Sequence, residues 1–247
     1  MEVHHHSHSS RKKWTHYFWE FLMLFLAVFT GFMAENQREH FVEHQREKQF
    51  IQSLIDDVTA DTARLNTIIN TRNTRDEQLD SLTRLINSDS AAQRTSAIYF
   101  FVPNITRNVI VQFTSNDGTM QQLKNSGGLR LIRKRRLADS IVRYDASTRS
   151  LIKLGDQEND IINTFRSTAW KVANSIELGR MTDEDNVPLR INYDPPLEPG
   201  YRLHLNEFNY RILSARSMNK GYRRESRKLL RQATNLLTIL KKEYQIE

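Results

Sequence analysis

Two histidines and a glutamate lie within about one helical turn of each other in the segment HFVEH, residues 40–44. Their order matches the H-x-x-E-H pattern of inverted zinc peptidases, in which the histidines share a metal ion and the glutamate acts as a base. His40, Glu43 and His44 stand in a highly charged stretch, without an evident third ligand. A metal shared between subunits, with His40 and His44 from each, is a second interpretation. We favour a third, a solvated helix face, and therefore predict no metal site.

Basic residues gather in two runs. The denser patch comprises Arg130, Arg133, Lys134, Arg135 and Arg136, and the second run comprises Arg223, Arg224, Arg227, Lys228 and Arg231. Neither run has the interleaved aromatic residues of single-strand binders, and nucleic acid binding would also require a cytoplasmic domain. We therefore predict no nucleic acid partner. Anionic lipid, an acidic partner or plain solvation accounts for the patches.

Other catalytic patterns are missing from the sequence. The chain of 247 residues contains no cysteine, which excludes disulfides, thiolate metal sites and a cysteine nucleophile. It also lacks a glycine-rich phosphate loop and a G-x-S-x-G nucleophile elbow. The histidine tract at positions 4–8 reads as a disordered tail. We predict a protein that is not an enzyme, with neither catalytic residues nor a cofactor.

The element that positions everything else is an apolar segment near the N-terminus. Residues 14–34 read WTHYFWEFLMLFLAVFTGFMA, which is about the length needed to cross a hydrocarbon core as a helix. Arg11, Lys12 and Lys13 precede it, so the positive-inside rule places residues 1–13 in the cytoplasm as a tail. Signal peptide cleavage requires small residues at −1 and −3, but Ala34 and Gly31 each have a phenylalanine at −3, so we predict an uncleaved anchor.

Polar and small residues within the anchor suggest contacts in the membrane. Glu20 is a candidate for proton or ion coupling, although its nearness to the cytoplasmic interface favours anchoring or a helix–helix hydrogen bond. Ala27 and Gly31 lie four residues apart, as do Thr30 and Ala34, which gives one small-residue face for close helix packing. A homo-oligomer is therefore one expected assembly.

Beyond the anchor, residues 35–247 are predicted to form an extracytoplasmic, all-α domain. Apolar residues recur at steps of three and four from Ile51 to Ile86, from Leu137 to Ile176 and from Phe208 to Leu240. Arg72 and Asp76 interrupt the first stripe, so we expect a bend or looser contact there. Residues 98–113 fit short helices or a strand, and 180–203 is proline-rich, which predicts a loop. Together these elements predict an extended antiparallel helical bundle that continues from the transmembrane helix.

Two blocks of sequence give a family resemblance. The His- and Lys-rich start followed by EFLMLFLAVFTGFMAEN, residues 20–36, and the block QQLKNSGGLRLIR, residues 121–133, resemble an uncharacterised family of single-pass inner-membrane proteins of Gram-negative bacteria. The resemblance implies a bacterial inner membrane, with the main domain in the periplasm. It implies no activity, and the run Lys134, Arg135 and Arg136 departs from the mixed charge that follows this block in the family.

These features predict a non-enzymatic envelope scaffold or docking module, whose partner is the membrane together with a second copy or another envelope protein. The alternative is a sensor-like, ligand-binding helical bundle that signals through the transmembrane helix. Its cytoplasmic side offers too few residues for an output domain. A buried polar pocket between the helices would favour sensing, whereas exposed patches around residues 193–201 would favour docking.

Overall fold

The computed structural model describes residues 14–88, 94–107, 112–185 and 187–246. The chain divides into two compact units, Met1–Gln49 and Phe50–Glu247. All the named elements in the described residues are helices; the only extended pairing there is two isolated bridges. The prediction of an all-helical protein is therefore confirmed in this general form.

The first unit contains the beginning of helix α1, which extends without interruption from Trp14 to Ile86. Its N-terminal part is long and apolar enough to cross a membrane, judged by length and composition alone. None of the side chains in that apolar window is buried within the protein. Contact with lipid would explain why so many phenylalanine, leucine and methionine side chains are exposed in this segment.

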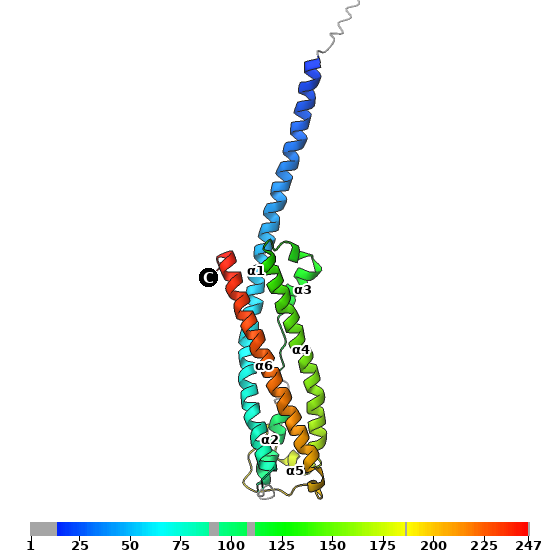
Figure 1. Cartoon of the computed structure of the whole chain (residues 1–247), viewed down its shortest axis with the longest axis vertical. Coiled ribbons are helices and arrows are strands. Elements are labelled where there is room, and N and C mark those ends of the chain that lie inside the picture. The colour runs from blue at the N-terminus through cyan, green and yellow to red at the C-terminus, as the bar shows by residue number, and fades with distance from the viewer. Residues whose placement is uncertain (1–13, 89–93, 108–111, 186, 247) are drawn as a thin grey trace, which may run out of the picture. The chain divides into compact units, whose positions relative to one another are not determined.

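The second unit, which we call the helical domain, contains the remaining elements. They are α2 (Thr95–Arg107), α3 (Gly118–Asn125), η3 (Gly128–Arg130), α4 (Arg135–Ala169), α5 (Ser175–Arg180), η4 (Tyr201–His204) and α6 (Leu205–Tyr244). Helices α4 and α6 lie side by side, and the later part of α1 lies along both (Figure 1). The predicted long helices in the first and last stripes are confirmed as α1 and α6.

Two apolar clusters make up most of the core of the helical domain. One gathers residues such as Ile51 and Leu65 of α1, Leu137 of α4 and Leu240 of α6. The other is built around later residues of α1 with Phe165 and Phe208, whose rings stack with centroids 5.5 Å apart. Buried polar residues lie between the two sets along α1, α4 and α6.

The middle helix is shorter than its apolar pattern predicts. The stripe extends to Ile176, but α4 ends at Ala169 and a separate helix, α5, begins at Ser175. The side chain of Asn174 accepts hydrogen bonds from the N–H groups of Ile176 and Glu177, at 3.0 and 3.3 Å. Asparagine at this position caps a new helix start, which is why the chain turns while its apolar spacing continues.

The ambiguous segment before α3 contains a helix. Helix α2 includes Pro103, which lacks the N–H that would bond to the carbonyl of Tyr99. Residues 108–111 lie outside the described residues, and those from Gln112 to Asp117 are irregular. Helix α3 ends at Asn125, and Gly127 just beyond it adopts a left-handed φ of 70° that favours glycine.

Candidate functional site

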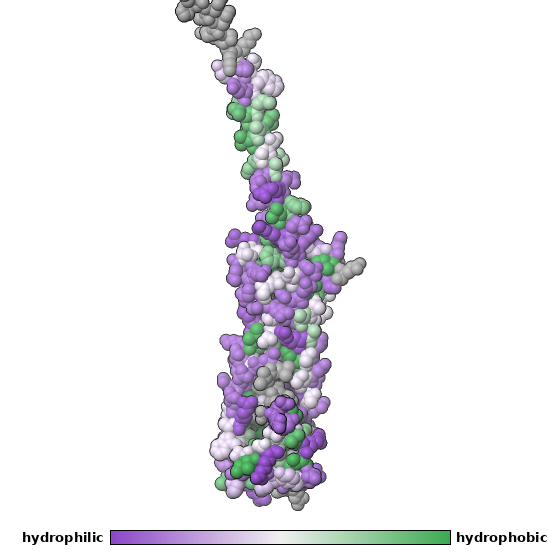
Figure 2. Space-filling view, turned by 180° about the vertical axis from the view of Figure 1, so that it is seen from behind, coloured by the Kyte–Doolittle hydropathy of each residue, from purple (hydrophilic) through white to green (hydrophobic). Residues whose placement is uncertain are grey.

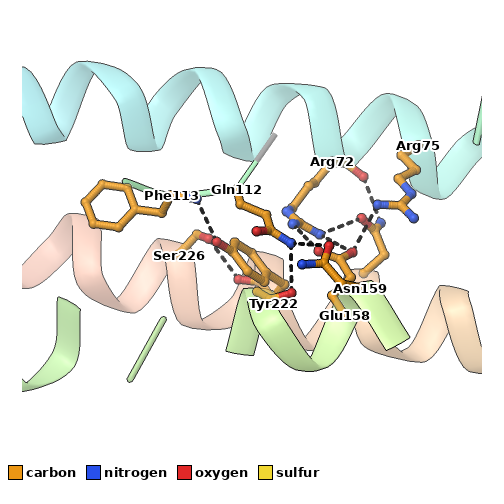
Figure 3. Close-up of polar contacts among 10 residues, drawn as sticks. Arg72, Arg75, Gln112, Phe113, Glu158, Asn159, Tyr222 and Ser226 are labelled. Atoms are coloured by element: carbon orange, nitrogen blue, oxygen red, sulfur yellow. Dashed lines mark hydrogen bonds and ion pairs between the residues drawn. The ribbon is translucent and has the colours of Figure 1, made fainter. Parts of the chain in front are cut away.

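A buried polar layer crosses the helical domain between the two apolar clusters (Figure 3). It consists of Arg72 and Arg75 from α1, Glu158 from α4, and Asn219 and Tyr222 from α6, each 2% exposed or less. All five positions fall on the inward faces of their helices, where the surrounding stripe is apolar. The sequence analysis noted Arg72 as a break in the first stripe. The structure shows that it meets Glu158, a polar residue within the apolar stripe of α4.

Glu158 is the common acceptor of the polar layer. Arg72 binds it with two hydrogen bonds, Nη1 to Oε1 at 2.9 Å and Nη2 to Oε2 at 2.6 Å. Arg75 adds a third, from Nη1 to Oε1 at 3.0 Å. A paired fork of this kind fixes both direction and distance, so the layer sets the register of α1 against α4.

Helix α6 completes the layer through Asn219 and Tyr222. The amide of Asn219 donates from Nδ2 to the backbone carbonyl of Arg72 at 3.0 Å, while its Oδ1 accepts from Arg72 Nη1 at 3.3 Å. The guanidinium of Arg72 lies 3.5 Å from the ring centroid of Tyr222, a cation–π contact. The Tyr222 hydroxyl accepts the N–H of Phe113 at 2.8 Å, and burial raises the pKa of this phenol.

The polar layer contains two cationic side chains and one carboxylate. Burial lowers the pKa of Arg75 to about 10, although the neighbouring carboxylate opposes that shift. Two donors of Arg75, Nε and Nη2, have no hydrogen-bond partner in the described structure. Buried donors without partners are uncommon in native proteins and call for an explanation. Arg75 is thus the least satisfied member of the layer.

Gln112 joins the layer to the irregular segment that precedes α3. Its Nε2 donates to the carbonyl of Gly155 at 2.7 Å and to Oδ1 of Asn159 at 2.8 Å. A Cβ at Gly155 would lie 3.1 Å from the Gln112 side chain. Glycine at this position therefore lets the segment pack directly on α4.

A second buried polar contact centres on Asp61 of α1. Its carboxylate accepts the Tyr144 hydroxyl at 2.7 Å and the Asn116 N–H at 3.0 Å. Burial raises the pKa of Asp61, and the hydrogen bonds oppose that rise. Burial and the adjacent carboxylate also raise the pKa of Tyr144. Through these two hydrogen bonds, Asp61 links α1 to α4 and to the segment before α3.

The histidine candidates lie on α1 in the first unit and face glutamates of their own helix. Nδ1 of His40 is 3.8 Å from Glu43, and Nδ1 of His44 is 3.2 Å from Glu47. Within the described ranges, no group of three potential metal ligands comes together. These contacts are the i,i+3 pairs of a charged helix face. Neither the predicted absence of a metal site nor the alternative of a metal shared between subunits is tested by this structure.

The membrane candidates are exposed along α1. Glu20, Ala27 and Ala34 all lie on its open surface, and a Cβ at Gly31 would meet nothing within 4 Å. The Thr30 hydroxyl bonds within its own helix, to the Leu26 carbonyl at 2.7 Å. The roles predicted for these residues in coupling and helix packing therefore stay predictions.

The denser basic patch lines part of a groove of about 750 Å³ between the start of α4 and the end of α6. Lys134, Arg135, Arg136 and Arg143 contribute to its walls, and Lys134 pairs with Glu243 across it. Arg130 and Arg133 are exposed nearby in the sequence. In the second basic run, Arg223 reaches Asn73 at 2.9 Å and Asp76 at 3.4 Å. That run is therefore partly engaged in holding α6 to α1.

Exposed apolar side chains concentrate at the end of the helical domain that carries α5. Among the described residues of this domain, ten large hydrophobic side chains are exposed, and eight of them fall between residues 170 and 213. We call these eight the exposed apolar set: Trp170, Ile176, Val187, Leu189, Tyr193, Leu203, Tyr210 and Leu213. Figure 2 shows hydrophobic surface at this end on the face in view. Sequence reasoning covered Tyr193, within residues 193–201, but missed most of the others. Ile176, for example, keeps the apolar spacing that begins at Leu137, and its exposure is not visible from that spacing.

The backbone that carries part of this set is held to α2. Tyr99 donates its hydroxyl to the Pro196 carbonyl and accepts the Asn174 N–H, both at 2.7 Å. Thr95 donates to the Pro195 carbonyl at 2.6 Å, and Asp194 accepts the Ser96 N–H at 2.9 Å. The Ser96 donors lower the pKa of Asp194. The surface around residues 194–197 is therefore fixed by hydrogen bonds.

Comparison of the chain with protein-family models, with curated proteins and with solved structures gives no match.

Proposed function

We propose that this protein is a membrane-anchored docking module, non-enzymatic, whose helical domain lies outside the cytoplasm. The observation that carries the proposal is the exposed apolar set at the α5 end of the helical domain. Apolar side chains gathered at one end of a domain are typical of protein interaction sites. The apolar start of α1 supplies an anchor of suitable length.

The architecture that we infer is an antiparallel bundle of α1, α4 and α6, closed at one end by the proline-rich segment 180–203. The order of colours along the three helices in Figure 1 supports it, as do the contacts of Arg72 with α4 and α6. The basic residues before the anchor support an N-terminus in the cytoplasm. The family resemblance supports the inner membrane of a Gram-negative bacterium and a periplasmic domain.

The occupant that we propose for the exposed apolar set is another envelope protein with a matching apolar surface. A second copy of this chain would instead be expected to associate through the anchor, at Ala27, Gly31 and Ala34. The two associations use different parts of the chain, so a single set of crosslinking experiments can distinguish them.

Site-specific photocrosslinking tests this proposal in a Gram-negative host. A photoreactive residue at Leu203 (85% exposed) or Tyr210 (62% exposed) is expected to link one envelope protein reproducibly. Ile152, which is exposed on α4 outside the set, is the matched control position. A Leu203→Asp change should lower the yield from Tyr210. Equal yields of the same product from all three positions would contradict docking at this surface, and links only between copies would favour a self-contained oligomer.

The sensor-like alternative has one observation in its favour, the unsatisfied edge of Arg75 in the polar layer. A ligand there would bind between three helices, one of which continues into the anchor segment. None of the five cavities described is lined by Arg75, so none of them provides a ligand site at this edge of the polar layer. Docking therefore remains the better supported function.

A further inference from the structure

We propose that the polar layer holds one small inorganic anion, of the charge and size of chloride, against the Nε–Nη2 edge of Arg75. The inference concerns the centre of the helical domain and does not depend on the docking function. It rests on three features of the structure: the charge balance of the layer, the free edge of one guanidinium, and the close packing around it.

The charge balance leaves one positive charge without a counterion. Arg72 and Arg75 share the single carboxylate of Glu158, and both arginines are 2% exposed. The nearby Asp76 is engaged elsewhere, with Arg216 at 3.7 Å and Arg223 at 3.4 Å. A charge removed from water needs a partner of opposite sign, and a bound anion supplies one.

The geometry of Arg75 selects an anion over a neutral group. Its Nη1 is used by Glu158, whereas Nε and Nη2 on the adjacent edge have no partner. In Figure 3 the second terminal nitrogen of Arg75 points away from Glu158. The Nε and Nη2 hydrogens of an arginine lie side by side in one plane, so a single anion can accept both. A water molecule could accept the same two hydrogens but would leave the charge uncompensated.

The packing limits the size of the occupant. Arg75 is 2% exposed, contacts Glu158 of α4, and lines none of the five cavities described. A halide fills about the space of a water molecule, whereas a phosphate or an organic acid needs several times that volume. Chloride is therefore the ligand that we propose, because it matches the charge and is among the smallest anions.

Thermal unfolding of the full chain in detergent, followed by far-UV circular dichroism, tests the proposal. Chloride is compared with gluconate at equal ionic strength, because gluconate has the same charge but is too large for the layer. We expect a saturable rise in melting temperature of about 2–4 °C in chloride. Arg75→Met should abolish this rise. Arg216→Met, which changes a partly exposed arginine of α6, should keep it.

Two results would overturn the proposal: equal melting temperatures in chloride and gluconate, or a chloride effect that persists in Arg75→Met. Should that variant fail to fold, crystals of the unaltered protein grown in bromide decide the question. An anomalous peak within hydrogen-bond distance of Arg75 Nε and Nη2 is the expected result, and a well-ordered layer without that peak contradicts it. Neither result bears on crosslinking at Leu203, so the two proposals fail independently.

Discussion

Glu158 is the residue on which the polar layer depends most. It accepts from both arginines, and its side chain is fully buried. Glu158→Gln should lower the free energy of unfolding by about 3–5 kcal/mol, because two buried cations lose their charged partner. Urea unfolding in detergent measures the loss. Asp160→Asn, an exposed change on the same helix, should stay within about 0.5 kcal/mol of the parent protein.

A double-mutant cycle measures the interaction between Arg75 and the carboxylate of Glu158. If Arg75 depends on the carboxylate, Arg75→Met should be less destabilising in the Glu158→Gln background than in the parent protein. Strictly additive losses would show that the two side chains do not interact, which would contradict the contact at 3.0 Å.

Asp61 should make stability depend on pH in the direction opposite to most carboxylates. Its folded pKa is raised by burial, so the folded state binds the proton more tightly than the unfolded state does. The stability contributed by protonation is therefore present below the unfolded pKa of about 3.8 and is lost as pH rises through the folded value. Asp61→Asn should remove this loss, so the free energy of unfolding of the variant should increase relative to that of the parent protein as pH rises from about 4. Urea midpoints across that range would show it; parallel curves would contradict it.

At the scale of the helices, two glycines provide a matched comparison. Gly221 in α6 has open space where a Cβ would lie, so Gly221→Ala should raise the free energy of unfolding by up to about 1 kcal/mol. Gly155→Ala should lower it by about 1 kcal/mol. The added methyl group at Gly155 would displace the Gln112 side chain and weaken its two hydrogen bonds, each of which contributes about 0.5–1.5 kcal/mol. That loss outweighs the gain in helix propensity. Equal stabilisation by both changes would show that Gln112 adjusts freely.

The helices themselves follow closely from the sequence. Apolar spacing predicted α1 beyond the anchor and α6, because one buried face leaves a regular period. The end of α4 could not be predicted in this way, since Val172 and Ile176 keep the period after the helix has stopped. What ends it is local, in the capping side chain of Asn174.

The polar layer could be predicted only in part. Arg72 and Glu158 are visible as polar residues in apolar stripes, but no spacing says that residues 86 positions apart will meet. That pairing depends on how α1 and α4 align, which packing decides. The sequence predicts a bend or looser contact near Arg72, but α1 continues there as one helix and Arg72 exchanges hydrogen bonds with α4 and α6.

For the whole molecule, the first question is which side of the membrane holds the helical domain. The chain has no cysteine, so single-cysteine variants report on one position each. In intact spheroplasts, a membrane-impermeant maleimide should label Ser167→Cys, which is exposed on α4, and should label Ser9→Cys only after lysis. The reverse pattern would place the domain in the cytoplasm and contradict the proposed envelope function.

The division of the core by the polar layer has a consequence for how the helical domain opens. The two apolar clusters are joined by side chains that exchange hydrogen bonds with one another, and polar contacts of this kind are less costly to separate once water reaches them. Each cluster can therefore act as its own cooperative unit. Amide hydrogen exchange should show two levels of protection, one for helix segments around Ile51 and Leu240 and another for those around Phe165 and Phe208. A single level throughout would mean that the arginines and Glu158 hold the two halves together as one.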